Sequence, residues 1–260
     1  MRRSIRNAVG KFLARYDVAI TRRSSLHALR ENEKCSFDLQ FVREMNPESR
    51  SEIVELLRES KSQLRQDLFV LSELDFKKNG FFVEFGATDG VSLSNTFLLE
   101  KEFLWNGIVA EPARVWHDAL SKNRGVNVET KCVWENSSSA LTFNEVRYSE
   151  LSTIASFSGS DGRAREREVG KTYTVDTISL LDLLRKYKAP FEVDYLSIDT
   201  EGSELKILEA FDFDLYNIKV ITCEHNYTPM RERIFALLTR VGYERKHEKI
   251  SKFDDWYVRK

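Results

Sequence analysis

The stretch from Phe81 to Gly90, FFVEFGATDG, constrains the fold of this chain more than any other. It begins with five bulky, mostly apolar residues, which is typical of a strand buried on both faces. A turn containing Gly86 and Gly90 follows, and Ser92–Leu99 then offers polar residues that cap helices and an apolar run. A strand, a glycine turn and a helix in this order predict an open α/β sheet with a ligand site at the carboxyl ends of its strands.

The turn also indicates what kind of ligand binds there. A dinucleotide-binding turn reads G-x-G-x-x-G and holds a pyrophosphate, whereas this turn places two acids, Glu84 and Asp89, beside its glycines. Carboxylates repel a pyrophosphate and attract a cation. S-adenosylmethionine carries an ammonium, a sulfonium and a ribose, and it suits these residues. A tight turn without a ligand is the alternative interpretation.

Composition and charge exclude several classes of protein. With 260 residues, 42% of them hydrophobic and 31% charged, the chain has the make-up of a soluble globular protein with one α/β core and an appendage. The formal net charge of −1 argues against nucleic-acid binding. The three cysteines follow no metal-binding spacing and indicate a reducing compartment, so we expect a cytoplasmic protein. No apolar run is long enough to span a bilayer.

Two regions are expected, an N-terminal helical, basic extension at 1–61 and an α/β domain at 62–260. Ile5, Val9 and Phe12 recur at helical spacing among arginines and lysines. This pattern predicts an amphipathic helix in peripheral contact with the anionic inner face of a membrane. A docking helix with a solvated basic side is the alternative.

Polar residues precede the first strand, at the end of a helical pattern that covers residues 49–75. They are Ser62, Gln63, Gln66 and Asp67. These side chains either line one wall of the ligand crevice or form an exposed polar face of a helix.

The second strand, Gly107–Ala110, ends at Glu111 and Pro112. An acid at this position, about twenty residues after the glycine turn, is where ribose hydroxyls are held in open sheets. A third strand is expected at 126–134 and ends in Val133 and Trp134. Trp134 either stacks on a purine or is a buried structural residue.

A later strand with an acidic turn lies at Val193–Glu204, and it repeats the pattern of the first stretch. Asp199 and Glu201 follow this strand. The next strand, Ile218–Cys223, ends in Glu224, His225 and Asn226. The carboxyl ends of neighbouring parallel strands meet at one edge, so we expect these polar groups to lie together. Helix capping is the alternative role for Glu201.

Two further segments complete the expected domain. Residues 149–167 are polar and rich in Ser, Gly, Arg and Glu, which predicts a mobile loop, and loops of this length are usually lids or binding loops. Residues 246–258 alternate in polarity and predict a closing hairpin.

Five motifs together resemble the FkbM-type methyltransferase family. They are VEFGATDGVSLSNT at 83–96, EP at 111–112, SELSTI at 149–154, LSIDTEGSE at 196–204 and CEHNY at 223–227. The resemblance covers about residues 62–258. It implies a Rossmann-like class I methyltransferase sheet, mostly parallel with an antiparallel last strand. It also implies S-adenosylmethionine as cofactor and an O-methyltransferase that acts on sugar hydroxyls of glycans, glycolipids, nucleotide sugars or natural products.

The resemblance also implies a cofactor site, residue by residue. The methionine end would be formed by Glu84, Gly86, Ala87, Asp89 and Gly90, flanked by Ser94, Asn95 and Thr96. The ribose and adenine would lie against Glu111, Pro112, Val133 and Trp134, with Asp199 also at the cofactor.

Methyl transfer to an alcohol requires a base close to the methyl group. We expect His225 in this role, with Asp199 and Glu224 orienting it or binding the sugar. No metal ligand is assigned, because methyl transfer does not require a metal. Mg²⁺ held by Asp199, Glu224 and Asn226 is the alternative.

Two other functions compete with this interpretation. A nicotinamide-dependent oxidoreductase would share the sheet, although the glycine spacing and Asp89 argue against it. A noncatalytic, membrane-docked scaffold would keep the fold without activity, although the acids at Glu84, Glu111 and Asp199 are all present.

Overall fold

A computed structural model describes residues 23–260, and the chain forms two compact units, Met1–Arg43 and Glu44–Lys260. Helix α2, Arg23–Glu44, is the described part of the first unit, and Leu26, Leu29 and Leu39 are exposed on it. The membrane-contact prediction rests mainly on residues before Arg23 and lies outside the described residues. In residues 23–260, no helix is both long enough and apolar enough to cross a membrane.

The second unit is built on a seven-stranded sheet with the order β10-β11-β9-β8-β1-β2-β3. Its strands are β1 Phe81–Phe85, β2 Asn106–Ala110, β3 Asn127–Glu129, β8 Glu192–Ile198, β9 Asn217–Glu224, β10 Tyr243–Lys246 and β11 Asp254–Arg259. β11 pairs antiparallel with both of its neighbours, and the other central pairs are parallel. The expected Rossmann-like sheet with an antiparallel last strand is therefore confirmed.

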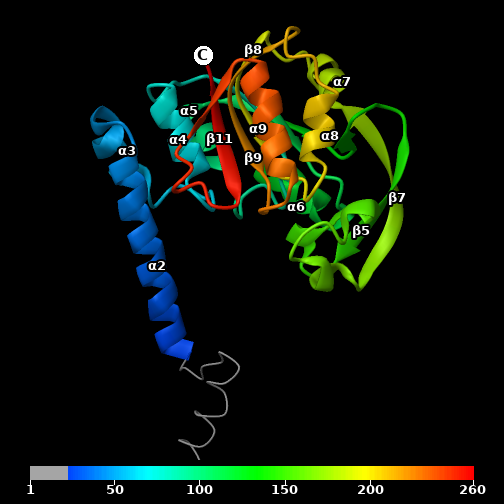
Figure 1. Cartoon of the computed structure of the whole chain (residues 1–260), viewed down its shortest axis with the longest axis horizontal. Coiled ribbons are helices and arrows are strands. Elements are labelled where there is room, and N and C mark those ends of the chain that lie inside the picture. Colours follow the sequence, from blue (N-terminus) through cyan, green and yellow to red (C-terminus); the bar gives the residue numbers. More distant parts are fainter. Residues whose placement is uncertain (1–22) are drawn as a thin grey trace, which may run out of the picture. The chain divides into compact units, whose positions relative to one another are not determined.

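A second sheet of four strands has the order β4-β7-β5-β6. It consists of β4 Cys132–Trp134, β5 Ala140–Val146, β6 Thr153–Ile154 and β7 Gly170–Ser179, and β5 and β7 lie to one side of α7 and α8 (Figure 1). The single strand predicted at 126–134 is wrong, because β3 and β4 belong to different sheets. The long antiparallel pair of β5 and β7 takes β4 as its parallel neighbour.

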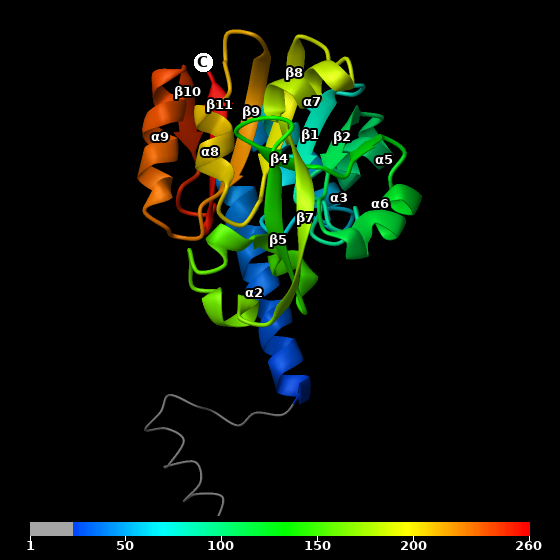
Figure 2. The ribbon, with the colours of Figure 1, turned by 90° about the vertical axis from the view of Figure 1, so that its right-hand side faces the viewer.

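Helices cover both faces of the main sheet. They are α3 Arg50–Leu56, α4 Gln66–Glu73, α5 Phe97–Phe103, α6 His117–Asn123, α7 Leu180–Lys186, α8 Glu204–Glu209 and α9 Met230–Arg240. Figure 2 shows α8 and α9 against the strands on one face. The second unit begins at Glu44 and therefore includes α3.

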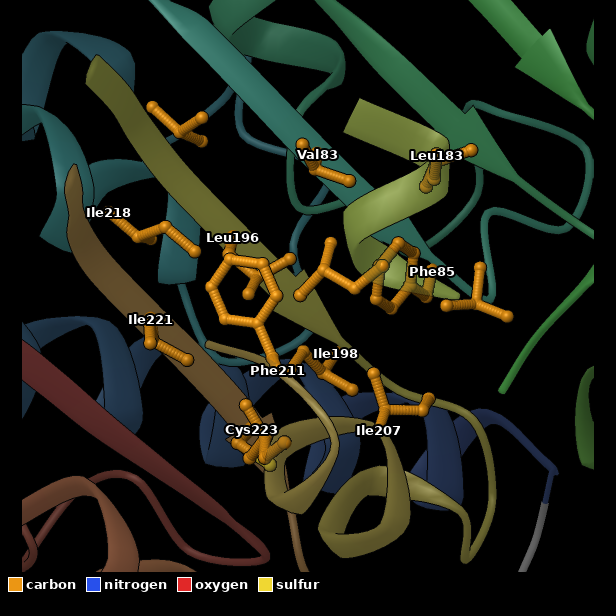
Figure 3. Packing of buried hydrophobic residues seen from close by; sticks show 14 of the residues in the cluster. Val83, Phe85, Leu183, Leu196, Ile198, Ile207, Phe211, Ile218, Ile221 and Cys223 are labelled. Atoms are coloured by element: carbon orange, nitrogen blue, oxygen red, sulfur yellow. The ribbon is translucent and has the colours of Figure 1, made fainter. Parts of the chain in front are cut away.

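Alternation along the strands separates the core from the site. Val83, Phe85, Leu196 and Ile198 point into the apolar cluster beneath α7–α9 (Figure 3). Successive strand residues point to opposite faces, so Glu84 and the other intervening residues face the second layer of helices. The central strands therefore carry apolar side chains on one face and polar groups on the other, near their carboxyl ends.

Candidate active site

One cavity lies at the carboxyl edge of the main sheet. The predicted site residues that line it are Glu84, Gly86, Ser94, Asn95, Glu111, Pro112, Val133, Asp199 and Glu224. Gln63 and Gln66, one of the two alternatives for the segment before β1, line it as well. Among the described residues, Ala87, Asp89, Gly90, Thr96, Trp134 and His225 do not line this cavity.

Gly86 brings the turns after β1 and β8 into contact. It has φ +75°, and a Cβ there would lie 1.9 Å from the carbonyl oxygen of Asp199. No other residue fits this position, because a side chain would meet fixed backbone and the left-handed conformation is costly. The cofactor turn and the acidic turn are thus held side by side.

The side chain of Glu84 forms hydrogen bonds within the turn that follows β1. Its oxygens accept hydrogen bonds from the Asn95 backbone N–H at 2.6 Å and from the hydroxyls of Thr96 at 2.6 Å and Ser94 at 3.0 Å. Arg124, whose side chain is fully buried, also pairs with Glu84 at 3.2 Å. With these partners in place, Glu84 is an unsuitable receptor for the cofactor ammonium. Arg124 lies at the end of α6, where an arginine is usually solvated, so no sequence signal identified it.

The geometry of Asp89 does not support its expected role either. Its carboxylate accepts from the backbone N–H groups of Val91 at 2.8 Å and Ser92 at 2.7 Å, and from the Ser92 hydroxyl at 2.8 Å. Asp89 therefore caps the turn, as short acids commonly do. Gly90 has a packing role, since a Cβ there would lie 2.7 Å from Cγ of Arg124.

Asn95 provides the free acceptor that an ammonium needs. Its side-chain nitrogen donates to Oγ of Ser197 at 2.9 Å, and its Oδ1 is buried without a hydrogen-bond partner. Buried polar atoms are rarely left unpaired, so a lone acceptor on a cavity wall indicates a ligand donor. Together with the carboxylate of Glu111, it gives a set of acceptors that fits the ammonium and ribose of S-adenosylmethionine.

Glu111 occupies the expected ribose position at the end of β2. Its oxygens accept backbone N–H groups of Thr88 at 2.9 Å and Ala113 at 2.7 Å, which leaves lone pairs for two hydroxyls. Burial raises the pKa of this carboxyl to about 7, despite those two hydrogen bonds. Val133 lines the same end of the cavity, whereas Trp134 packs edge-on against Phe157.

Three acids lie in a row on adjacent strand ends. Asp199 follows β8 beside Glu224 of β9, and Glu224 pairs in register with Asp254 of β11. Neighbouring side chains at matched positions lie on the same face of a sheet, and all three line the cavity. Asp254 was missed because the hairpin pattern gave no reason to separate it from other surface acids.

The environment of these acids disfavours their charged forms. Burial, with the nearby charge of Glu204, raises the pKa of Asp199 to about 6. Burial and then repulsion by Asp199 raise the pKa of Glu224 well above its usual range. The two carboxyls therefore oppose each other's ionisation.

The turn after β8 adds a fourth acid under strain. Glu201 has φ +59°, a left-handed conformation that is uncommon for non-glycine residues. Glu204 stabilises this turn, since its Oε1 accepts from the N–H groups of Thr200 at 2.9 Å and Gly202 at 3.0 Å. Burial and Asp199 raise the pKa of Glu201 to about 8, and Arg167, 2.5 Å away, opposes this shift.

The segment expected to be a lid or a binding loop contains short regular elements. Residues 149–167 contain three short 3₁₀ turns and strand β6. Ser149, Glu150 and Ile154 line the cavity, and Arg167 is buried with ion pairs to Asp161 and Glu201. This segment therefore forms one wall of the cavity.

His225 lies away from the main cavity. Its Nδ1 accepts the backbone N–H of Tyr227 at 3.0 Å, and its Nε2 lies 3.8 Å from Asp255. Burial lowers the pKa of the imidazole, and the residue borders a neighbouring cavity between α8 and α9 instead. This geometry does not support the predicted role of His225 as general base, and the acids of the cavity are better placed for it.

The sheet order, the antiparallel β11 and the cavity at the carboxyl edge define a Rossmann-like protein of the methyltransferase class. The model of the methyltransferase FkbM domain matches residues 84–245, which is more than half of the chain. The chain therefore belongs to the FkbM methyltransferase family, and it is an S-adenosylmethionine-dependent methyltransferase.

Solved structures share only weak similarity with the chain. A precorrin-6y C5,15-methyltransferase from Geobacter metallireducens is 11% identical with a TM-score of 0.40, over 74% of this chain and 85% of the other. A putative RNA methyltransferase from Pyrococcus horikoshii is 13% identical with a TM-score of 0.37, over 75% and 81%. No curated protein matches the chain.

Proposed function

We propose that this chain transfers a methyl group from S-adenosylmethionine to a hydroxyl group of a carbohydrate acceptor. The observation that carries the proposal is a single cavity along neighbouring strand ends, lined by Glu111 after β2, Gly86 after β1 and the acids Asp199 and Glu224 at the ends of β8 and β9. Val133 lines the same cavity. Glu111 suits a nucleoside, and Asp199 and Glu224 suit an acceptor that donates hydrogen bonds.

The residues of the cavity divide the work. When bound, the cofactor supplies an electrophilic methyl group on a sulfonium. Glu111 accepts hydrogen bonds from ribose hydroxyls, and Asn95 accepts one from the ammonium, which fixes the donor in line with the acceptor. The acids at Asp199 and Glu224 accept a hydrogen bond from the acceptor hydroxyl and receive its proton as the new oxygen–carbon bond forms.

The polar lining favours a sugar over an apolar alcohol. Gln63, Gln66, Ser149, Glu150 and Ser152 all face the cavity near the acids. Amide, hydroxyl and carboxylate groups pair with several hydroxyls at once, and they would stay unpaired around an apolar acceptor.

An acceptor screen tests the proposal. The full chain is incubated with S-adenosylmethionine and panels of glycans, glycolipids and nucleotide sugars, and products are analysed by mass spectrometry for one added methyl group on oxygen. Calorimetry with S-adenosylhomocysteine and with NAD measures cofactor choice in parallel. We expect binding of the first ligand only, and methylation of at least one sugar.

Each other outcome contradicts the proposal in a different way. Binding of S-adenosylhomocysteine without transfer to any acceptor would favour the noncatalytic scaffold. Methylation of a nitrogen atom would show that the acceptor group is not a hydroxyl. Binding of NAD without S-adenosylhomocysteine would favour the nicotinamide-dependent oxidoreductase.

A further inference from the structure

Three carboxylates of the cavity meet in the geometry of a cation site. Asp199, Glu201 and Glu224 each offer an oxygen, and these oxygens all lie within 4.8 Å of one another. They come from the ends of β8 and β9 and from the strained turn between them. An all-oxygen set of carboxylates is what Mg²⁺, Mn²⁺ and Ca²⁺ prefer.

Positive charge from the chain does not balance this cluster. Arg167 pairs with Glu201 at 2.5 Å, but it is also shared with Asp161 at 2.7 Å. The charge of Arg167 also lowers the pKa of Asp199, so one positive charge is shared among Asp161, Glu201 and Asp199. Glu201 is buried and Asp199 and Glu224 are half-buried, and carboxylates withdrawn from water normally have a cationic partner or a metal.

An unpaired oxygen on the next strand points independently to a ligand. Asp254 is 4% exposed, lines the same cavity and pairs in register with Glu224. Its Oδ2 accepts from Gln66 at 3.0 Å, whereas its Oδ1 is buried without any partner. An orphaned carboxylate oxygen beside the cluster is suited to a water or hydroxyl bound to a cation.

Asn226 also accommodates a cation. Its side-chain amide nitrogen donates to Glu224 at 2.7 Å and to Glu201 at 3.3 Å. The same amide carries an oxygen, and a half-turn about its last bond would present that oxygen to the cluster as a neutral ligand.

We propose that Asp199, Glu201 and Glu224 bind one divalent cation of the Mg²⁺ or Mn²⁺ class, with Asp254 accepting a hydrogen bond from a group bound to that cation. The sequence favoured a site without a metal and left Mg²⁺ held by Asp199, Glu224 and Asn226 as the alternative. The proposal develops that alternative and adds Glu201 and Asp254 to it.

The cation has a role in the reaction that rests on the proposed function. When bound, the cation would orient the hydroxyl oxygen and lower the pKa of that hydroxyl, so its proton would pass more readily to a neighbouring carboxylate of the cavity as the oxygen–carbon bond forms. The acceptor then binds partly through the cation rather than through carboxylates alone.

Electron paramagnetic resonance with MnCl₂ tests the site without any methyl acceptor. Free Mn²⁺ gives a strong signal that is lost on binding, so titration of the full chain reports stoichiometry and affinity. We expect one tightly bound Mn²⁺ per chain, displaced by excess MgCl₂. Glu224→Gln and Asp199→Asn should each weaken binding more than about tenfold, since even indirect partners of metal ligands contribute that much.

Glu192→Gln is the matched control. Glu192 lies at the opposite end of β8, its side chain is 59% exposed, and it pairs with Lys219. Its substitution should leave Mn²⁺ affinity unchanged, and thermal melting confirms that all three variants fold. An absent signal change in the wild type at millimolar MnCl₂, or equal binding by Glu224→Gln, would overturn the cation site. Calorimetry with S-adenosylhomocysteine on the same samples separates that result from a failure of the proposed function.

Discussion

Asn95 shows how a single residue can replace the partner expected from the sequence. Glu84 and Asp89, the two acids near the glycine turn, were the expected receptors for an ammonium. The oxygens of both carboxylates accept hydrogen bonds from the turn itself. Asn95 Oδ1 is the acceptor left over on the cavity wall. A neutral oxygen suffices there because the acids nearby already supply negative potential.

Asn95→Ala should therefore weaken S-adenosylhomocysteine binding by roughly tenfold to a hundredfold, the usual value of a hydrogen bond to a charged group. Asp89→Asn keeps an oxygen that caps the turn, so it should bind almost as well as the wild type. Calorimetry on both variants checks the pair. A strong loss in Asp89→Asn with little change in Asn95→Ala would restore the original assignment.

At the scale of elements, the turn after β1 depends on a buried brace. Arg124 of the segment after α6 reaches Glu84 on β1 and Glu100 on α5, and its side chain is fully buried. It also donates to the Thr96 hydroxyl at 2.8 Å. One guanidinium thus ties a strand, a turn and two helices, and it offsets two buried carboxylates.

Arg124→Met should lower the free energy of unfolding by about 3–5 kcal/mol, because it leaves buried carboxylates without their cation. Arg185→Met is the control, since Arg185 is 60% exposed and lies 3.9 Å from Asp182. Its loss should cost less than about 1 kcal/mol. Urea unfolding of both variants gives the comparison, and equal stabilities would show that the brace is unimportant.

The same elements show what the sequence could predict. Local patterns identified β1, β8, β9 and their acidic ends, because strand, turn and helix signals are short-range. They did not separate β3 from β4, since two strands of three residues separated by two residues read as one run. They also missed Arg124, Arg167 and Asp254, whose partners lie 24 to 188 residues away or were unknown until the fold placed them. The sequence therefore predicted an acidic site at the carboxyl ends of the strands, but it did not predict which side chains contact one another there.

At the scale of the whole molecule, the cavity concentrates negative charge in a chain whose formal net charge is only −1. Glu111, Asp199, Glu201 and Glu224 all have raised pKa values, with burial as the largest cause. Each of them makes the folded protein hold protons that the unfolded chain releases. Ionisation of these buried acids therefore lowers the free energy of unfolding of the unliganded protein. A bound cationic cofactor or metal would stabilise their ionised forms.

The pH dependence of the unfolding free energy can be measured for one of these acids, Glu111. Its pKa rises from 4.5 to about 7 on folding, so its contribution to stability is complete below 4.5 and is lost as the pH rises to about 7. The total is on the order of 3 kcal/mol at about pH 8 relative to about pH 4. Glu111→Gln should flatten that part of the dependence of unfolding free energy on pH, although its absolute stability falls because an amide has one acceptor oxygen.

Cofactor affinity should change with pH in the opposite sense. Ionised Glu111 accepts two ribose hydroxyls and protonated Glu111 accepts fewer, so affinity for S-adenosylhomocysteine should rise as the pH passes about 7, while stability falls. Urea unfolding and calorimetry between about pH 5 and about pH 8 measure both slopes on the same protein. If Glu111→Gln retained the wild-type slope in both measurements, the titrating group would lie elsewhere in the cavity and the ribose assignment would fail with it.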